Sequence, residues 1–383
     1  MLTRDRLTIL VGLISFTLLG WSVASVSTSL PKIIREFTIP YEVAGLLAGA
    51  MPMGGVMGFA AGMLSDRLGY SRTAALALFV FMLGLLISTA PVNIAVVFIG
   101  FIVISVGSLL LVSSTSQMVV AAFRQRRSTM LNYMYAGWGF GISGGSVATA
   151  VLAEINWRIS FAAPVPVVFA LFLTALKKLR DHEKPQKLLE GSELSIFIRS
   201  VPVIAPSLFI VGVELGFATW LPSLLSIRYS GIGVGLSVAI FTVFMGLGRT
   251  FLGRIADVLG PIRSITYLGG CTAFSFLCFS LVNDFTTKLM ILPVIGLVVG
   301  PLLPTFTAWV ITIYPAHGGS VAGMVISFGR VGTFFVNWMV GLVLGLFGEL
   351  SAVMVFLLSC LMMIVYLNLL VRLMGLGVGH RRA

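Results

Sequence analysis

The amino-acid sequence predicts an all-α integral membrane protein whose twelve transmembrane helices form two pseudo-symmetric six-helix bundles. Three observations support this fold class: the composition, the even spacing of apolar segments, and a loop motif that occurs twice. Of the 383 residues, 58% are hydrophobic and only 10% are charged, and the mean hydropathy is +1.07. About 20 apolar residues cross a bilayer core, so we expect many crossings. A water-soluble globule is excluded, because it could not bury so much apolar surface.

Loop-forming residues divide the chain into twelve apolar spans at fairly even intervals. The first span is too long for the core of a signal peptide and lacks a clear cleavage site, so we interpret it as a retained membrane helix. The spans are expected at residues 7–30, 42–64, 72–90, 94–118, 128–152, 159–176, 200–226, 232–254, 264–282, 287–313, 319–344 and 350–373.

The longest polar stretch lies near the middle of the chain, at residues 177–199. We expect it to be a cytoplasmic loop that joins an N-terminal bundle of residues 1–176 to a C-terminal bundle of residues 200–383. Prolines interrupt three of the spans and are expected to bend them. These prolines are Pro52 in the second span, Pro206 in the seventh, and Pro301 and Pro304 in the tenth.

The basic residues predict the orientation of the chain in the membrane. With the N-terminus in the cytoplasm, 18 of the 25 Lys and Arg residues lie on the cytoplasmic side and 2 lie within spans. The 5 on the opposite, outer side are Lys32, Arg35, Arg158, Arg228 and Lys288. We therefore expect a multi-pass protein of the cell membrane with both termini in the cytoplasm. The net charge of +12 is interpreted as an orientation signal, which argues against nucleic acid as a partner.

A loop motif occurs twice, after the second and after the eighth span. Residues 62–72 read GMLSDRLGYSR and residues 253–263 read GRIADVLGPIR, so both follow G-x-x-x-D-x-L-G-x-x-R. The copies lie 191 residues apart, half of the chain, which predicts a duplicated architecture. The expected gating residues are Gly62, Asp66, Arg67, Gly69 and Arg72 in the first copy, and Gly253, Asp257, Gly260 and Arg263 in the second.

The repeated motif resembles the loop signature of the major facilitator superfamily of transporters. The resemblance covers the whole chain in the number of spans, the orientation and the central loop, and it implies a transporter without specifying the substrate. In the second copy Val258 replaces the first basic residue, which departs from the pattern of the family. The resemblance implies a cytoplasmic latch, and the alternative is a tight turn that also carries positive charge.

Asp66 and Asp257 each end a helix that runs into the cytoplasm, so each lies at the negative end of its own helix dipole. That position is unfavourable unless a cation or the positive N-terminus of another helix lies opposite. The pseudo-twofold symmetry places residues 318–320, at the start of the eleventh span, opposite Asp66. It places residues 128–129, at the start of the fifth span, opposite Asp257. Arg124, at the end of the fourth span, is expected as a further cation.

Three ionisable residues lie at membrane depth, all in the second half of the chain. Glu214 lies halfway along the seventh span, Arg330 halfway along the eleventh, and Arg249 near the cytoplasmic end of the eighth. Such a group costs at least about 2.5–3.5 kcal/mol to insert, so each is expected to be functional. Two guanidinium groups against one carboxylate predict an anionic substrate, because guanidinium offers planar, paired donors that match a carboxylate.

Two further resemblances, to subgroups of the superfamily, point in different directions. The pattern Arg249-x-x-x-Gly253-x-x-x-Asp257 is similar to the eighth helix of oxalate and monocarboxylate carriers, which implies that this arginine contacts a substrate carboxylate. Arg330 fits the second cation that the oxalate carrier has on its eleventh helix. Residues 212–222, GVELGFATWLP, resemble fucose-permease-like sugar symporters. Those place a carboxylate on the first and fourth helices, whereas this chain has none in its first or fourth span.

The three charged residues also have structural alternatives. Glu214 and Arg330 could pair with each other as a bridge between two spans, and Arg249 could brace the second motif loop. A combined hypothesis assigns proton coupling to Glu214, since its protonation would release Arg330 to accept an anion.

Aromatic and amide side chains are expected to shape the rest of the substrate site. Asn132, Tyr135 and Trp138 lie on the fifth span, which lines the cavity in the proteins that this chain resembles. Trp21 and Asn337 lie on the first and the eleventh span. For each of these residues, packing or a place at the lipid interface is the alternative.

The sequence thus predicts a secondary active transporter that moves a small organic anion, a carboxylate, by alternating access and with proton coupling. The alternatives are a proton-coupled symporter of a sugar or polyol, an efflux antiporter of drugs or metabolites, and a non-transporting receptor or scaffold. Drug–proton antiporters share a Gly-Pro…Gly-Gly element on the fifth helix, where this chain has Ile142 in place of the proline. The expected partners are the solute, a proton or a sodium ion, and the lipid bilayer, and the expected state is a monomer.

An enzyme is not expected. The sequence contains no Walker loop and no nucleophile–base pair, and its three histidines lie near the expected cytoplasmic surface. Cys271, Cys278 and Cys360 lie inside apolar runs without the spacing of zinc ligands or of a disulfide framework. We therefore expect neither a metal nor a cofactor.

Overall fold

The structure, a computed structural model, describes residues 4–53, 64, 68–90, 93–123, 127–178, 192–314 and 318–374. The regular structure in these ranges is helical. The chain divides into two compact units, one of Met1–Leu188 with Ala218–Thr242, and one of Leu189–Phe217 with Val243–Ala383. The helices α9 (Pro206–Leu225) and α10 (Ile232–Phe251) therefore contribute residues to both units.

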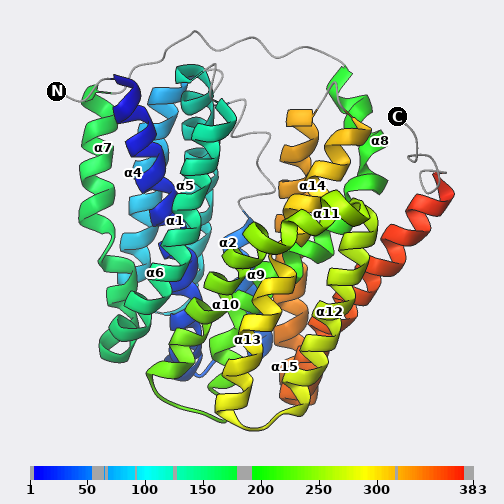
Figure 1. The fold of residues 1–383 in the computed structure, drawn as a ribbon. Helices are drawn as coiled ribbons and strands as arrows, with labels where there is room; N and C mark the ends of the chain where they lie inside the picture. The colour runs from blue at the N-terminus through cyan, green and yellow to red at the C-terminus, as the bar shows by residue number, and fades with distance from the viewer. Residues whose placement is uncertain are drawn as a thin grey trace. The chain divides into compact units, whose positions relative to one another are not determined.

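The first unit contains the apolar segments of the first half of the chain together with Ala218–Thr242. These segments are helical because a backbone in lipid must satisfy its own hydrogen bonds. Helix α1 packs along α6, and α4 packs along α5 and α7 (Figure 1). The bounds of these helices are α1 Arg4–Phe37, α2 Tyr41–Met53, α4 Tyr70–Thr89, α5 Ile94–Ala122, α6 Arg127–Ala162 and α7 Val165–Lys178.

Helices α1 and α6 approach each other closely at two glycines. A Cβ atom on Gly20 would lie 2.3 Å from the carbonyl oxygen of Trp138. A Cβ atom on Gly141 would lie 2.0 Å from the carbonyl oxygen of Thr17. Neither position can hold a side chain at this separation, since van der Waals contact between heavy atoms needs about 3.5 Å. The small residues thus fix α6 against α1, which places the aromatic residues expected on these two helices.

In the second unit, the helices of the second half other than Ala218–Thr242 pack around a cluster of aromatic rings. Helix α12 packs against α13, α14 and α15. The rings of Phe217, Phe276 and Phe356 meet here with centroids 4.9 to 5.5 Å apart. Helix α8 begins at Ser192, inside the loop expected at residues 177–199. The bounds are α8 Ser192–Ile204, η2 Leu252–Arg254, α11 Ile255–Leu259, α12 Pro261–Leu281, α13 Phe285–Val299, α14 Leu302–Ile313 and α15 Gly318–Leu373.

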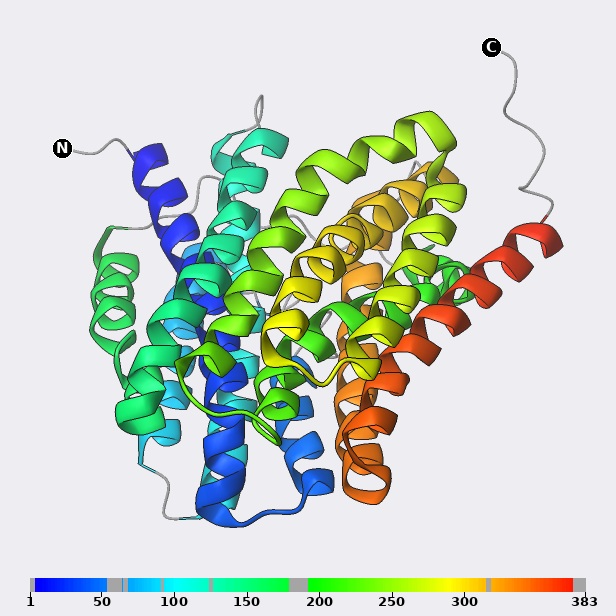
Figure 2. The ribbon, with the colours of Figure 1, turned by 60° about the horizontal axis from the view of Figure 1, so that its bottom comes forward.

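Two long helices, α6 and α15, each contain one sharp turn. In α6 the turn is at Asn156, which is extended (φ −162°, ψ 120°) and whose side-chain oxygen accepts a hydrogen bond from the N–H of Arg158 at 3.0 Å. In α15 the turn is at Gly348, which has a positive φ of 83°. Glycine adopts such an angle readily because it has no Cβ atom. Figures 1 and 2 show α15 turning back on itself, its first part in orange and its second in red. The turns lie 192 residues apart, close to the offset between the two motif copies.

These turns reconcile the observed helices with the expected spans. Nine helical segments among the described residues are long and apolar enough to cross a bilayer. Two of them, Tyr133–Lys177 and Val321–Leu373, contain a turn and cover two expected spans each. The second expected span is described only in part and is not among the nine. With that span the segments amount to twelve, and the predicted all-α, twelve-helix membrane fold is confirmed.

Two expected spans are interrupted where the sequence contains proline. The seventh span begins in α8 and continues in α9, which starts at Pro206. The tenth span consists of α13 and α14, joined by Gly300 and Pro301. Both breaks agree with the predicted bends, because proline lacks the N–H that a continuous helix needs. Pro52, by contrast, lies inside the described part of α2.

Candidate functional site

A buried ion pair joins α9 to α10 within the second unit. The carboxylate of Glu214 accepts a hydrogen bond from Nη2 of Arg249 at its Oε1 atom. The side chain of Glu214 is 2% exposed, and that of Arg249 is 32% exposed. The second oxygen of Glu214, Oε2, is buried and has no hydrogen-bond partner among the described residues. A buried carboxylate with one unused oxygen is costly, which marks this position as more than a packing contact.

The guanidinium of Arg249 has a second anchor in the break between α13 and α14. Its Nε atom donates to the carbonyl oxygen of Gly300 at 3.2 Å. Arg249 is therefore held at two points, by a side chain of α9 and by the backbone of the helix break. Sequence analysis missed Gly300, although the Gly-Pro pair at 300–301 and Pro304 were a signal that a carbonyl would be released there.

Arg330 lies on α15 and is half-buried. Its positive charge acts on the carboxylate of Glu214. The residues singled out at membrane depth therefore form one electrostatic group, with two cations and one anion. One alternative above paired Glu214 with Arg330, and the structure adds Arg249 as a hydrogen-bonded guanidinium on that carboxylate.

Asn337 lies on the same helix as Arg330 and is fully buried. A Cβ atom on Gly216 would lie 3.5 Å from the Oδ1 atom of Asn337, so this amide faces α9 close to Glu214. Helices α9 and α15 meet at backbone distance here, since a Cβ atom on Gly332 would lie 1.9 Å from the carbonyl oxygen of Leu208. The close approach places the amide near the charged group.

The aromatic residues expected at the site lie in the first unit. The indole N–H of Trp21 donates to the carbonyl oxygen of Ser160 at 2.8 Å, which ties α1 to α6. The ring of Tyr135 meets that of Phe16 edge to face, with centroids 4.8 Å apart, and its side chain is exposed. Trp138 is half-buried. The side chain of Asn132 lies outside the described part of the chain, so its role stays a prediction.

The two motif copies share one local geometry where the structure describes them. Gly69 (φ 90°, ψ 149°) precedes α4, and Gly260 (φ 80°, ψ 155°) precedes α12. The carbonyl of Gly69 accepts from the backbone and side chain of Thr73, at 3.0 and 2.9 Å. The carbonyl of Gly260 accepts from the backbone and side chain of Ser264, at 3.1 and 2.8 Å. The duplicated loop therefore has the same glycine-dependent entry into the next helix.

The expected latch around these glycines stays a prediction. Arg72, Arg263 and Val258 are exposed, and Val258 occupies the basic position of the second copy with 83% of its surface exposed. Gly253 lies in η2. Gly62, Asp66, Arg67, Arg124 and the side chain of Asp257 lie outside the described residues.

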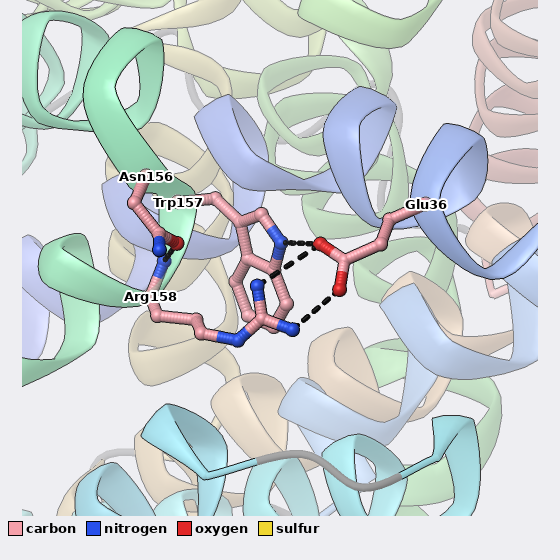
Figure 3. Close-up of polar contacts among 4 residues, drawn as sticks. All are labelled: Glu36, Asn156, Trp157 and Arg158. Atoms are coloured by element: carbon pink, nitrogen blue, oxygen red, sulfur yellow. Dashed lines mark hydrogen bonds and ion pairs between the residues drawn. The ribbon is translucent and has the colours of Figure 1, made fainter.

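A carboxylate on α1 holds the turn of α6 in the first unit (Figure 3). Glu36 accepts from Nε1 of Trp157 at 2.7 Å and from Nη1 of Arg158 at 3.0 Å. The second amino group of Arg158 donates to the other oxygen of Glu36, and its guanidinium lies 4.6 Å from the centre of the Trp157 ring. Sequence analysis counted Arg158 only as an orientation charge and missed this cluster.

A second missed cluster lies in the second unit. Lys288 of α13 forms an ion pair with Glu349, next to the turn of α15, and its amino group lies 4.8 Å from the centre of the Phe279 ring. An ion pair and an aromatic ring therefore stabilise both sharp turns, the one in α6 and the one in α15. The signal in the sequence was the lysine placed inside the start of a span rather than before it.

The chain matches a protein family and is similar in fold to solved structures. The model of the Major Facilitator Superfamily matches residues 12–337. The nucleoside transporter NupG is 12% identical, with a TM-score of 0.78 over 97% of this chain and 99% of that one. A D-xylose–proton symporter is 13% identical, with a TM-score of 0.73 over 93% and 96%. A bacterial homolog of the human lysosomal transporter Spinster is 12% identical, with a TM-score of 0.72 over 96% of each chain.

At these identities the solved structures show a common fold and do not assign a substrate. The family model covers most of the chain, and the neighbours with the same fold are transporters. The match to this family indicates a transporter rather than an enzyme. The chain belongs to the major facilitator superfamily of membrane transporters.

Proposed function

We propose that this protein carries a small organic anion, a carboxylate, across the membrane together with a proton. The proposed site is the group of Glu214, Arg249 and Arg330 in the second unit. The supporting observation is the buried carboxylate of Glu214 in a membrane-spanning helix. One of its oxygens accepts a hydrogen bond from the guanidinium of Arg249, and the other has no hydrogen-bond partner among the described residues. A substrate carboxylate has the same shape and charge as the group that Arg249 now binds.

The coupling follows from charge balance at this group. With Glu214 ionised, the two guanidinium groups and one carboxylate carry a net charge of +1. When a proton binds to Glu214, the carboxyl becomes neutral and its hold on Arg249 weakens, because hydrogen bonds between ionised partners are the stronger ones. The group then carries +2 and attracts an anion. Proton and anion therefore bind together, with Arg249 as the guanidinium released and Arg330 as the second cation.

Movement of the solute is assigned to alternating access between the two six-helix bundles, at residues 1–176 and 200–383. The prediction that both termini are cytoplasmic belongs to the same proposal. In it the motif loops lie on the cytoplasmic side and close the path there. The repeated geometry at Gly69 and Gly260 supports this duplication.

A second candidate is a proton-coupled symporter of a neutral solute, such as a sugar or a polyol. It is favoured by the fact that Arg249 is already engaged, by Glu214 and by the carbonyl of Gly300. In this case the arginine would keep the carboxylate in place and would not contact the solute. The two candidates differ in whether Arg249 is needed for solute binding or only for proton coupling.

A counterflow experiment with purified protein in liposomes distinguishes the candidates. Vesicles loaded with one unlabelled solute take up the labelled solute only if the protein exchanges it. We expect exchange of small carboxylates and none of neutral sugars or polyols. Exchange of sugars without carboxylates would replace the first candidate by the second.

The role of Glu214 is tested by the variant Glu214→Gln. The amide keeps the shape of the side chain but cannot take part in proton exchange, so we expect loss of accumulation driven by a pH gradient while counterflow persists. The matched control is Glu154→Gln, which alters an exposed carboxylate paired with Lys32 at 3.1 Å in the first unit. Accumulation that survives in Glu214→Gln would show that another group couples the proton.

A further inference from the structure

The break between α13 and α14 releases one backbone carbonyl toward Arg249. In a continuous helix the carbonyl of Gly300 would accept the N–H of residue 304. That residue is Pro304, which has no N–H. Helical bonding continues one position later, where the N–H of Thr305 donates to the carbonyl of Pro301 at 3.1 Å. The Gly300 carbonyl instead accepts from Nε of Arg249 at 3.2 Å.

Glycine brings α10 close enough for this contact. A Cβ atom on Gly300 would lie 2.2 Å from the carbonyl oxygen of Met245, one turn before Arg249. On the other side, a Cβ atom on Gly248 would lie 2.1 Å from the carbonyl oxygen of Leu297. The backbones of α10 and of the helix break are therefore in direct contact. An arginine leaving α10 at this point meets the carbonyl with its Nε atom rather than with its outer amino groups.

The two prolines of the break act on different carbonyls. Pro301 removes the donor for Leu297, and Pro304 removes the donor for Gly300, by the same four-residue rule. Only the second carbonyl binds Arg249. Pro301 is therefore a control built into the same break.

We propose that Gly300 and Pro304 are positioning residues for Arg249. They keep the plane of its guanidinium group in place when Glu214 is protonated and its hydrogen bond to Arg249 is lost. This inference rests on the proposed carboxylate site. Guanidinium has five N–H donors in one plane, and Nε is fixed by a backbone group that does not titrate. The outer amino groups then keep facing the place that the Glu214 carboxylate occupies. A substrate carboxylate meets a preformed fork, which lowers the entropic cost of binding it.

The variant Pro304→Ala tests the inference. Alanine supplies an N–H that competes with Arg249 for the Gly300 carbonyl, and it is compatible with the helix that α14 already forms. Arginine reactivity toward a dicarbonyl reagent, read at each site by mass spectrometry of the intact transporter, reports the release of Nε without any substrate. We expect Arg249 to react several-fold faster in Pro304→Ala and at the wild-type rate in Pro301→Ala. Pro304→Ser supplies the same N–H and is read in the same way.

Transport measurements give the second readout. Loss of a hydrogen bond to a charged group weakens binding by roughly tenfold or more, so KM for the exchanged carboxylate should rise about tenfold in Pro304→Ala with little change in maximal rate. In an Arg249→Lys background, which lacks Nε, Pro304→Ala should have no further effect on KM. A further rise of the same size in that background would overturn the inference.

The labelling experiment has two outcomes that would contradict the positioning role, and neither depends on knowing the substrate. Equal reactivity of Arg249 in wild type and Pro304→Ala would overturn the positioning role, and so would an equal increase in both proline variants. Failure of the proposed function is distinct. In that case the reactivity of Arg249 changes as expected while the counterflow screen finds no carboxylate.

Discussion

Lys288 and Glu349 form an ion pair that is almost completely removed from solvent, with side chains 2% and 8% exposed. The pair joins the start of α13 to the turn of α15, and the lysine also lies against the ring of Phe279. Two charges buried in helices that span lipid are stable only as a pair, because each alone would be costly there. The pair therefore fastens the turn between the last two spans to its neighbour.

We predict that replacing only one residue of this pair destabilises the protein far more than replacing both residues by apolar ones. Lys288→Met leaves Glu349 buried without its cation and should cost about 3–5 kcal/mol of unfolding free energy. The double variant Lys288→Met with Glu349→Leu replaces both charges by apolar groups and should recover most of that loss. The measurement is the half-unfolding temperature of the purified protein in detergent.

The first unit provides the control. Lys32→Met breaks the single contact with Glu154, in which the two side chains are 29% and 50% exposed, and should cost only about 0–1 kcal/mol. A double variant at Lys288 and Glu349 as unstable as the single one would contradict the prediction.

The burial of Lys288 is a feature that the sequence alone did not predict. Composition and the spacing of apolar runs predicted the spans, because both are local properties that lipid enforces on every segment. Lys288 was counted as a residue of the outer surface, since it lies at the edge of the expected span. Its depth depends on where the turn at Gly348 places Glu349, which no local pattern contains.

The sequence predicted which residues form the charged site but not which of them form hydrogen bonds with each other. Glu214, Arg249 and Arg330 stood out because ionisable residues at membrane depth are rare. Which guanidinium hydrogen bonds to the carboxylate depends on how the helices are rotated about their axes. The contact of Gly248 with Leu297 sets that rotation for α10, and it follows from packing between spans that are far apart in sequence.

The motif glycines give a prediction about the duplicated loop. Gly69 and Gly260 adopt φ of 90° and 80° with ψ near 150°, a region that is essentially restricted to glycine. Gly69→Ala and Gly260→Ala should each cost about 1–3 kcal/mol of unfolding free energy. Thermal unfolding of the two variants measures this, and we expect similar losses because the two loops share one geometry.

The matched control for these variants is Gly270→Ala. Gly270 lies inside α12, where a Cβ atom would meet nothing within 4 Å and no positive φ is present. Alanine is the better helix former by about 1 kcal/mol, so this variant should be as stable as wild type or more so. Variants of Gly69 or Gly260 that unfold like Gly270→Ala would contradict a strained turn.

Asp284 gives a prediction about pH, because it lies outside the membrane-spanning segments at the start of α13. Its Oδ2 atom accepts from the N–H and the hydroxyl of Thr287, both at 2.8 Å. The backbone hydrogen bond of Thr287 holds the pKa of the carboxyl below its usual value. A carboxyl with a lowered pKa in the folded state stabilises the fold above the pKa of the unfolded chain. This stabilisation is lost as the pH falls through the lower, folded pKa.

We therefore expect acid to weaken the N-cap of α13 through this single group. In Asp284→Asn the amide oxygen still accepts the cap hydrogen bond, so the half-unfolding temperature should lose the part of its acid dependence that Asp284 contributes. In Asp284→Ala the cap is absent at every pH, so the protein should be less stable than wild type at neutral pH and approach it in acid. Parallel titration of all three proteins below pH 6 is the measurement. Identical pH profiles for wild type and Asp284→Asn would show that this carboxylate is not linked to folding.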